Sequence, residues 1–341
     1  MSRTSKILVA LALALLLTGC SSAAAEVSYA PPESERLTVY TSHKEEVYSP
    51  IIREFEERTG IWVEVVTGGT NELLDRLERE ADSPAADVMF GGGVESLEHY
   101  GELFTPYLSS EAENIDPQYL PDDCLWTPFS ALPTVLIYNT KLVPAGQLTR
   151  WSDLLAPSSL YTGRIAFADP EISGSSYTVL VTLLLSQSGE WEDTIRAFAA
   201  AVDGGQLDSS GAVTDCMEDG SALVGITLEE TALKRIAAGS DIALVYPADG
   251  TSFVPDGSAL VRGAPHEDNA KAFLDFTVSR DVQELMASQY RRPVRTDVET
   301  SAELPEHETL AVLDYDVDWA SGSRDAILMT WQFCLGGEEM P

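Results

Sequence analysis

Four clusters of glycine and hydroxyl residues along the chain have the composition of an anion-binding site. Each follows a short apolar segment and leads into a predicted helix. The clusters are Thr41-Ser42-His43, Gly68-Gly69-Thr70, Gly91-Gly92-Gly93 and Ser173-Gly174-Ser175-Ser176. Glycine lets a ligand approach the backbone closely, and the unpaired N–H groups at the start of a helix attract negative charge. Together the clusters predict a cradle for a phosphate, phosphonate, carboxylate or sulfate group, although each one alone could be an ordinary helix cap or turn.

Two later clusters combine hydroxyl groups with carboxylates. They are Asp208-Ser209-Ser210 and Thr227-Leu228-Glu229-Glu230. Carboxylates beside a cleft can accept hydrogen bonds from sugar hydroxyls or pair with an ammonium group. We therefore add Asp208, Ser209, Thr227 and Glu229 to the candidate ligand-binding residues. The alternative is a solvated helix start, where glutamate is favoured in any case.

Residue types that support catalysis or a metal centre do not occur in the required patterns. The four histidines, at positions 43, 99, 266 and 307, form no HExxH motif, and the chain has no GxSxG motif. The cysteines after Cys20 show no zinc-site spacing. We therefore expect a protein that is not an enzyme and that needs no cofactor and no metal.

The elements that position these clusters alternate between strands and helices. Apolar segments at residues 37–40, 62–66 and 87–90 predict strands, and segments of helical periodicity separate them. The first helix contains Pro50, so we expect it either to begin at Ser49 or to be kinked at the proline. The alternation returns later, which predicts parallel βαβ units. Further strands are predicted at residues 132–138, 164–167, 222–226, 241–246 and 258–261.

The order of these elements predicts an α/β protein of two lobes, each a mixed, mostly parallel sheet flanked by helices. We expect residues 36–135 with 257–341 to form the first lobe and residues 136–256 to form the second. Ligands of open parallel sheets bind beyond the carboxyl ends of the strands, so the candidate site lies in the cleft between the lobes. These boundaries place Cys124 and Cys334 in one lobe, where they could form a disulfide. The alternative is that these two cysteines and Cys216 are all free.

The N-terminus predicts an exported, membrane-anchored protein. A basic start precedes an apolar run of about eleven residues, too short to span a bilayer, which is typical of a signal peptide over residues 1–19. Leu17-Thr18-Gly19-Cys20 resembles the lipobox of bacterial lipoproteins, and this implies that Cys20 is lipidated. An ordinary signal peptide with an incidental cysteine is the alternative. Residues 20–35 would then be a flexible tether, and the protein would be extracytoplasmic.

The formal net charge of −34 argues against the binding of nucleic acid, which requires basic patches. It also argues against peripheral attachment to anionic lipid. An acidic protein could capture a cation such as a metal ion or a polyamine. The acidic residues are spread along the chain, however, and we interpret them as a solvated surface.

Several segments resemble the type II extracellular solute-binding proteins of bacteria, in particular the ferric-ion, phosphonate and hexose-phosphate binders. The segments are LTVYTSH at 37–43, FEERTGI at 55–61, ADVMF at 86–90, YN at 138–139 and DGTSFVPDG at 249–257. The resemblance covers essentially the whole mature chain. It implies two lobes that close on a small-molecule ligand and then dock on an ABC permease, whose ATPase supplies the energy. We expect a monomer.

The match to the ferric binders is incomplete. Those proteins hold iron with two adjacent tyrosines where this chain has Glu229-Glu230, although His43 matches a histidine near their start. The phosphonate and organophosphate relatives resemble this chain more closely. Their resemblance implies that Ser42, Thr70, Gly92-Gly93 and Ser175-Ser176 hold the anionic group and that Asp208 and Glu229 contact the rest of the ligand.

The sequence therefore predicts the binding lipoprotein of an ABC importer, with a phosphorylated sugar or a phosphonate as its cargo. A ferric-ion or polyamine binder is the alternative within the same class. A receptor for a sensor kinase would use the same two lobes with another partner, and an enzyme is the least supported reading.

Overall fold

The computed structural model describes residues 31–156 and 159–336. The predicted signal peptide, Cys20 and the first part of the tether lie outside the described residues. The chain from Ser34 onward belongs to one compact unit. Among the described helices, none combines the length and the apolar character that a membrane span requires.

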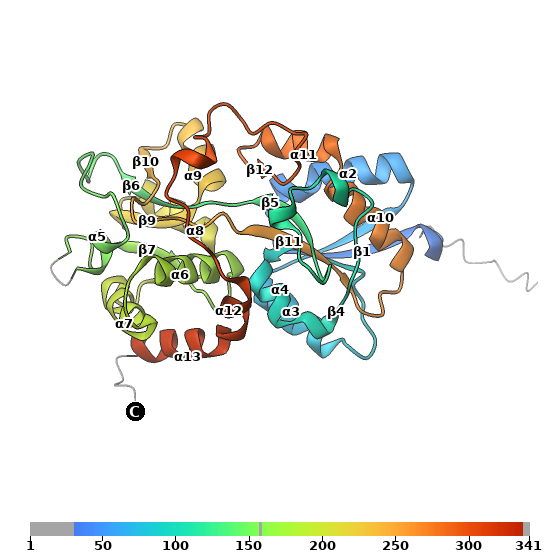
Figure 1. The fold of residues 1–341 in the computed structure, drawn as a ribbon, viewed down its shortest axis with the longest axis horizontal. Coiled ribbons are helices and arrows are strands. Elements are labelled where there is room, and N and C mark those ends of the chain that lie inside the picture. Colours follow the sequence, from blue (N-terminus) through green and yellow to red (C-terminus); the bar gives the residue numbers. More distant parts are fainter. Residues whose placement is uncertain (1–30, 157–158, 337–341) are drawn as a thin grey trace, which may run out of the picture. The chain divides into compact units, whose positions relative to one another are not determined.

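The first of two sheets contains the strands that precede three of the predicted clusters (Figure 1). Its strand order is β12-β5-β11-β3-β1-β2, with β4 paired to β11, and β1 is parallel to both β2 and β3. The strands are β1 (Arg36–Thr41), β2 (Trp62–Thr67), β3 (Val88–Gly93), β4 (Phe104–Thr105), β5 (Thr127–Ala131), β11 (Pro255–Val261) and β12 (Arg292–Pro293). The parallel core of this sheet therefore directs the ends of β1, β2 and β3 to one edge.

The second sheet has the strand order β10-β6-β9-β7-β8 and contains the remaining clusters. Strand β7 is parallel to β8 and β9, whereas β6 is antiparallel to β9 and β10. The strands are β6 (Thr134–Asn139), β7 (Ile165–Ala168), β8 (Gln206–Leu207), β9 (Val224–Leu228) and β10 (Ile242–Val245). The chain crosses from the first sheet to the second between β5 and β6 and returns between β10 and β11.

Helices pack around both sheets, and the described ones follow the strands in the predicted rhythm (Figure 1). The α-helices are α2 (Glu45–Thr59), α3 (Thr70–Arg79), α4 (Val94–His99), α5 (Ser152–Leu155), α6 (Gly174–Ser186), α7 (Trp191–Val202), α8 (Ser210–Glu218), α9 (Glu229–Ala237), α10 (Glu267–Thr277), α11 (Arg280–Ala287), α12 (Val317–Gly322) and α13 (Arg324–Leu335). The 3₁₀ turns are η1 (Glu33–Glu35), η2 (Gly101–Leu103), η3 (Ala112–Asn114), η4 (Pro117–Tyr119) and η5 (His307–Thr309).

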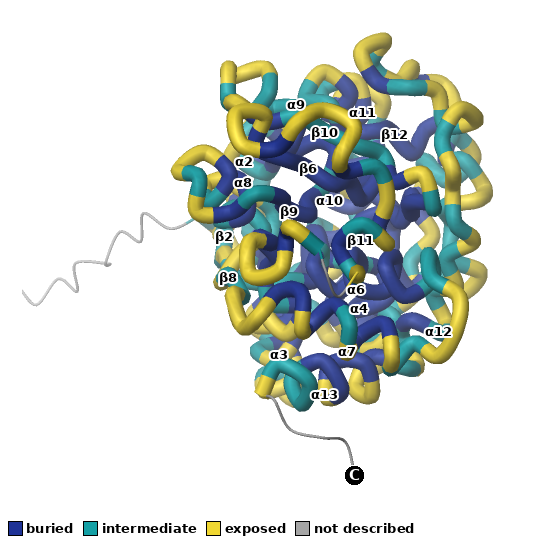
Figure 2. The backbone as a smooth tube through the Cα atoms, turned by 90° about the vertical axis from the view of Figure 1, so that its left-hand side faces the viewer, coloured by how far each residue is buried: buried dark blue, intermediate teal, exposed yellow. Residues whose placement is uncertain are grey.

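Burial of apolar side chains holds each helix to its sheet. Both β6 and β11 are buried along their whole length (Figure 2). In α2 the buried residues are Val47, Ile51, Ile52 and Phe55, a helical spacing that places them on one face. The ring of Phe55 meets that of Phe273 edge to face at 5.1 Å. Burying one such phenylalanine contributes about 1.5–3 kcal/mol.

Of the two expected arrangements of the first helix, a start at Ser49 is wrong. The helix begins at Glu45, and Pro50 lies inside it as in the second arrangement. Proline removes one backbone hydrogen bond from a helix interior. The turn before Pro50 nevertheless forms because Val47 is buried and because Glu45 and Glu46 suit the positive end of a helix.

The C-terminal helix packs against the second sheet. Trp331 of α13 lies 5.5 Å from the rings of both Phe167 and Phe198, and all three side chains are fully buried. The lobe boundaries remain a prediction. Because Trp331 packs against Phe167 and Phe198, we revise that prediction and assign α13 to the lobe of the second sheet.

The predicted disulfide is wrong, because Cys124, Cys216 and Cys334 are all free thiols. Cys334 packs against the hydrophobic cluster of the second sheet. The backbone of Cys124 instead accepts a hydrogen bond from Tyr107 N–H on the first-sheet side. The prediction failed because it assigned the last helix to the first lobe.

Candidate functional site

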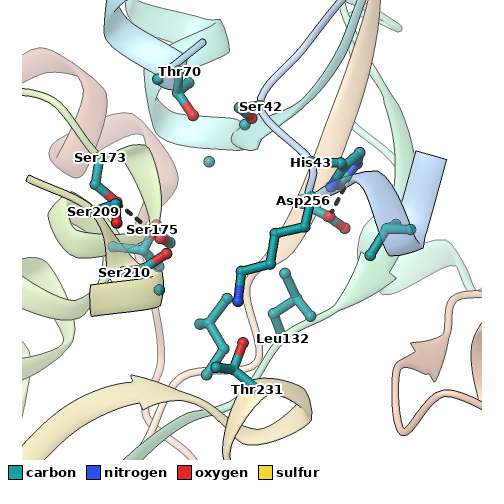
Figure 3. Close-up of a pocket in the computed structure, with 18 of the residues that line it drawn as sticks. Ser42, His43, Thr70, Leu132, Ser173, Ser175, Ser209, Ser210, Thr231 and Asp256 are labelled. Carbon is teal, nitrogen blue, oxygen red and sulfur yellow. Dashed lines mark hydrogen bonds and ion pairs between the residues drawn. The ribbon is translucent and has the colours of Figure 1, made fainter. Parts of the chain in front are cut away.

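A cavity of about 440 Å³ lies where loops of the two sheets meet. Ser42 and Thr70 come from the first sheet, and Ser173, Ser175, Ser209 and Ser210 come from the second (Figure 3). Figure 3 shows Ser173, Ser175, Ser209 and Ser210 gathered on one side of the cavity, with Ser42, His43 and Asp256 on the other. The cavity wall is therefore built by residues that lie far apart in the sequence.

Six helices begin at this cavity. Their N-cap residues all line it, namely Lys44 of α2, Gly69 of α3, Gly93 of α4, Ser173 of α6, Ser209 of α8 and Leu228 of α9. The first N–H groups of a helix have no partner within the helix, and the helix dipole adds partial positive charge there. The cavity thus receives positive potential from several directions without a lysine or arginine at each end.

Glycines allow the helix starts to approach one another. Gly92 has φ of +132°, and a Cβ atom added there would lie 2.9 Å from Cγ2 of Thr70. A Cβ atom at Gly174 would lie 2.9 Å from Oγ1 of the same threonine. Thr70 is therefore held between β3 of the first sheet and α6 of the second, and a larger residue at either glycine would separate them.

Most of the predicted site residues lie on the cavity wall. They are Ser42, His43, Gly69, Thr70, Gly92, Gly93, Ser173, Ser175, Asp208 and Ser209. Ser176, Thr227 and Glu229 do not line it. The backbone N–H of Ser176 donates to Ser173 Oγ, and this hydrogen bond caps the N-terminus of α6. Thr227 is buried in β9.

Glu229 lies behind the wall rather than on it. Its two carboxylate oxygens accept hydrogen bonds from Arg292 Nε at 2.8 Å and Nη2 at 2.9 Å, and Tyr246 donates to it as well. The adjacent Glu230 lines the cavity instead. The prediction for Glu229 therefore has no support in the geometry, because one step along a helix turns the side chain by about 100°.

The back of the cavity carries a buried ion pair that the sequence analysis missed. Arg291 pairs with Asp256 and donates from Nε to Ser130 Oγ at 2.9 Å. Ser130 donates to the same carboxylate from both its N–H and its hydroxyl group at 2.8 Å. Burial raises the pKa of Asp256, although Arg291 and Ser130 act against this shift.

His43 lies beside this ion pair. Its Nε2 atom is 3.6 Å from Asp256 Oδ2 and has no hydrogen-bond partner among the described residues. The ring packs edge to face on Phe90. Burial, together with the charge of Arg291, holds the pKa of His43 well below its usual value. The imidazole is therefore neutral at neutral pH.

Glu230 lies beside Arg291 on the cavity wall and forms a long ion pair with it. The distance from Arg291 Nη1 to Glu230 Oε2 is 4.0 Å, and Lys234 Nζ lies 2.6 Å from Glu230 Oε1. Burial opposes ionisation of Glu230, but Arg291 and Lys234 together lower its pKa below the usual value. An ionised carboxylate thus lines the cavity, where it can accept hydrogen bonds from a ligand.

The described residues do not assemble a metal site. No group of three or more histidine, cysteine, aspartate or glutamate side chains among them is arranged to hold a metal ion. His43 and Asp256 are close, but Arg291 already holds the Asp256 carboxylate. A cation placed there would meet the guanidinium group at short range.

The chain is similar in sequence to known bacterial binding proteins. The family model described as bacterial extracellular solute-binding protein matches residues 84–317. Iron uptake protein A1 of Synechocystis sp. is 26% identical over 302 residues, covering 83% of this chain and 82% of that protein. A periplasmic protein of Salmonella typhi named for binding 2-aminoethylphosphonate is 23% identical over 258 residues, covering 73% and 74%.

A solved structure shows the same fold. The periplasmic binding protein AfuA of Actinobacillus pleuropneumoniae, with fructose 6-phosphate bound, superposes with a TM-score of 0.81 at 24% identity. The match covers 88% of this chain and 98% of that protein. This similarity shows the arrangement of the two sheets and does not identify the ligand. The ligand class must be argued from the side chains in the cavity.

Proposed function

Because the chain belongs to the family of bacterial extracellular solute-binding proteins, we propose that it captures a small anionic organic solute, a phosphorylated sugar or a phosphonate, for an ABC importer. The family relation and the two-sheet fold confirm the predicted class, a type II binding protein rather than an enzyme. The choice of an anionic ligand rests on the cavity.

The convergence of six helix starts carries this proposal. Each helix start near an anion contributes about 0.3–1 kcal/mol, and more where the site is partly buried. Serine and threonine hydroxyls stand between these helix starts and can donate to anionic oxygens (Figure 3). A phosphate or phosphonate group at this place would be held by neutral donors, as expected from the glycine and hydroxyl clusters.

The carboxylates of the same wall suit the uncharged or cationic remainder of such a ligand. Asp208 and Glu230 line the cavity and can accept hydrogen bonds from sugar hydroxyls or from an amino group. This favours a ligand with an anionic end and a hydrogen-bond-donating end over inorganic phosphate. Glu230 takes the role that we first expected of Glu229.

The alternative cargo, ferric iron, fits the cavity less well. The residues that replace the tyrosine pair are engaged elsewhere, Glu229 with Arg292 and Glu230 with Lys234. The Asp256 carboxylate beside His43 is paired with Arg291 and is therefore not free to hold a trivalent cation.

The anchoring and the partners of the protein form a second part of the proposal. We propose that Cys20 carries the lipid anchor, that the mature protein is an extracytoplasmic monomer, and that it docks on a permease driven by an ATPase. Metabolic labelling with palmitate tests the anchor. Replacing Cys20 with alanine should abolish the labelling and release the protein from the membrane.

A thermal-shift screen tests the ligand class. The probes are glucose 6-phosphate, 2-aminoethylphosphonate, inorganic phosphate, spermidine and ferric citrate. A ligand at about 100 times its Kd adds about 2.7 kcal/mol of stability, so the Tm should rise measurably with the organic phosphate or phosphonate. A rise with ferric citrate or spermidine alone would refute the anion site.

A further inference from the structure

The ligand cavity continues into a second, more open chamber. This outer chamber has a volume of about 820 Å³ and shares four lining residues with the inner cavity, namely Lys44, Ser209, Gly211 and Thr231. Its other walls come from α2, α8, α9 and the turn after α11. Its lining is almost entirely polar or small, so it offers hydrogen bonds and charge rather than an apolar surface.

Lys44 stands at the junction of the two chambers. It is the N-cap residue of α2, beside the first sheet, yet its side chain extends toward α8 of the second sheet. A Cβ atom added at Gly211 in the first turn of α8 would lie 3.9 Å from Cε of Lys44. The ammonium group therefore lies beside the positive end of another helix, which is an unfavourable place for a cation unless an anion lies between them.

The other cations of the two chambers are neutralised by the protein itself. Lys234 pairs with Glu230 at 2.6 Å and with Glu46 at 3.2 Å. Arg235 pairs with Asp215 at 2.8 Å and with Glu218 at 3.3 Å. Arg291 pairs with Asp256.

Lys44 differs from these three, since no carboxylate among the described residues lies within ion-pairing distance of its ammonium group. Glu230 lines the same cavity and is influenced by the charge of Lys44 from beyond this distance, but its carboxylate is paired with Lys234 and Arg291. A lysine that lines the ligand cavity without a carboxylate at ion-pairing distance is available to a group on the ligand.

We infer that the ligand carries two acidic groups, one held by the inner helix starts and a second that pairs with Lys44 at the mouth of the outer chamber. This inference rests on the proposed function, since it requires the first group to bind as an anion. The ligand class is then an organic phosphate with a second phosphate or carboxylate, and Lys44 is the residue that selects it over a monophosphate. The polar outer chamber accommodates the second group and its hydration.

Isothermal titration calorimetry on the mature protein tests this inference with three probes. Glucose 6-phosphate has one acidic group, fructose 1,6-bisphosphate has two phosphates, and 3-phosphoglycerate has a phosphate and a carboxylate. We expect at least one of the two-acid probes to bind ten or more times as tightly as glucose 6-phosphate. Whichever binds tighter identifies the second group as a phosphate or a carboxylate.

Variants at Lys44 test whether this lysine binds the second acidic group specifically or only attracts any anion by its charge. Lys44→Gln should lower the affinity for the preferred two-acid probe tenfold or more. The same variant should change the affinity for glucose 6-phosphate less than threefold. Lys44→Arg should retain most of the preference for the two-acid probe over glucose 6-phosphate. Lys271→Gln is the matched control, because Lys271 pairs with Glu267 on α10, outside both chambers. It should leave all affinities unchanged.

The outcomes distinguish this inference from the proposed function. If glucose 6-phosphate binds as tightly as both two-acid probes, or if Lys44→Gln weakens all three probes equally, the second subsite is refuted while the anion site stands. If none of the three probes binds and 2-aminoethylphosphonate does not raise the Tm either, the proposed function fails as well.

Discussion

Thr178 of α6 donates a hydrogen bond to the fully buried carboxyl group of Glu95 in α4. The contact joins a helix of the second sheet to a helix that follows β3 of the first, and Thr178 itself lines the cavity. Burial raises the pKa of Glu95 above 4.5, and this outweighs the hydrogen bond from Thr178. The link between the two sheets therefore includes a carboxyl group that resists ionisation.

The first prediction concerns the pH dependence of this contact. A raised pKa in the folded state favours folding below pH 4.5, and this contribution is lost as the pH rises through the folded-state pKa. Glu95→Gln keeps an acceptor for Thr178 but has no proton to lose. We expect its Tm to exceed that of the wild type at pH 7.5 and to approach it near pH 4.

Thermal unfolding followed by circular dichroism across this pH range gives the measurement. Glu102→Gln is the control, because the Glu102 side chain is fully exposed. A gap in Tm that does not change with pH would contradict the role assigned to Glu95.

The second prediction concerns the anion cradle at Thr70. Thr70→Val has nearly the same shape, so the packing against Gly92 and Gly174 should persist while the hydroxyl group is lost. A hydrogen bond to a charged group contributes about 1.5–3 kcal/mol. In calorimetry we expect an affinity for the organic phosphate that is about 10 to 100 times lower than that of the wild type. In thermal unfolding we expect a Tm close to that of the wild type.

Thr38→Val gives a comparison for Thr70→Val, since Thr38 lies in β1 of the same sheet and does not line the cavity. It should leave ligand affinity unchanged. Equal losses of affinity in the two variants would show that the effect arises from the sheet rather than from the hydroxyl group.

The third prediction concerns the buried pair of Arg291 and Asp256. Removing one partner leaves a buried charge without compensation, which typically costs about 3–5 kcal/mol. Arg291→Met and Asp256→Leu should each be strongly destabilised in urea unfolding, and the double variant should recover much of the loss. If the two single losses add in the double variant, the residues do not act as a pair.

Much of the cavity could be predicted because its signals are local in the sequence. A strand, a glycine or hydroxyl cluster and a helix start follow one another within a few residues, as in the segment from β3 through Gly93 to α4. Parallel strands bring such clusters to one edge of a sheet. This is why Ser42, Thr70 and Gly92, which come from separate clusters, lie together on the cavity wall.

The missed residues depend on contacts between distant parts of the chain. Arg291 follows the end of α11, away from any strand-to-helix junction, and reaches the cavity only because β12 pairs with β5. Its partner Asp256 was part of a family-like segment, but no local pattern indicated a buried ion pair. The position of α13 was missed for a similar reason, since its contact with α7 is purely tertiary.

The choice between Glu229 and Glu230 was a question of helix phase. Adjacent residues in a helix point about 100° apart, and the sequence does not reveal the rotation of α9 about its axis. That rotation is set by the buried contact of Glu229 with Arg292, a residue 63 positions away. The structure therefore separates two roles that the sequence could not distinguish.

The last prediction uses these two adjacent glutamates as a matched pair. Glu229→Gln removes the charge that compensates the buried guanidinium of Arg292, so it should lower the free energy of unfolding by about 3 kcal/mol or more. Ligand affinity per folded molecule should change little, because Glu229 does not line the cavity. Glu230→Gln should do the opposite. It should lower the affinity for a hydroxyl- or amino-bearing phosphate about tenfold or more, because a charged hydrogen bond to the ligand is lost. Its loss of stability should be smaller than that of Glu229→Gln. Urea unfolding and calorimetry on both variants measure the two effects, and a larger loss of affinity at Glu229 than at Glu230 would reverse the assignment.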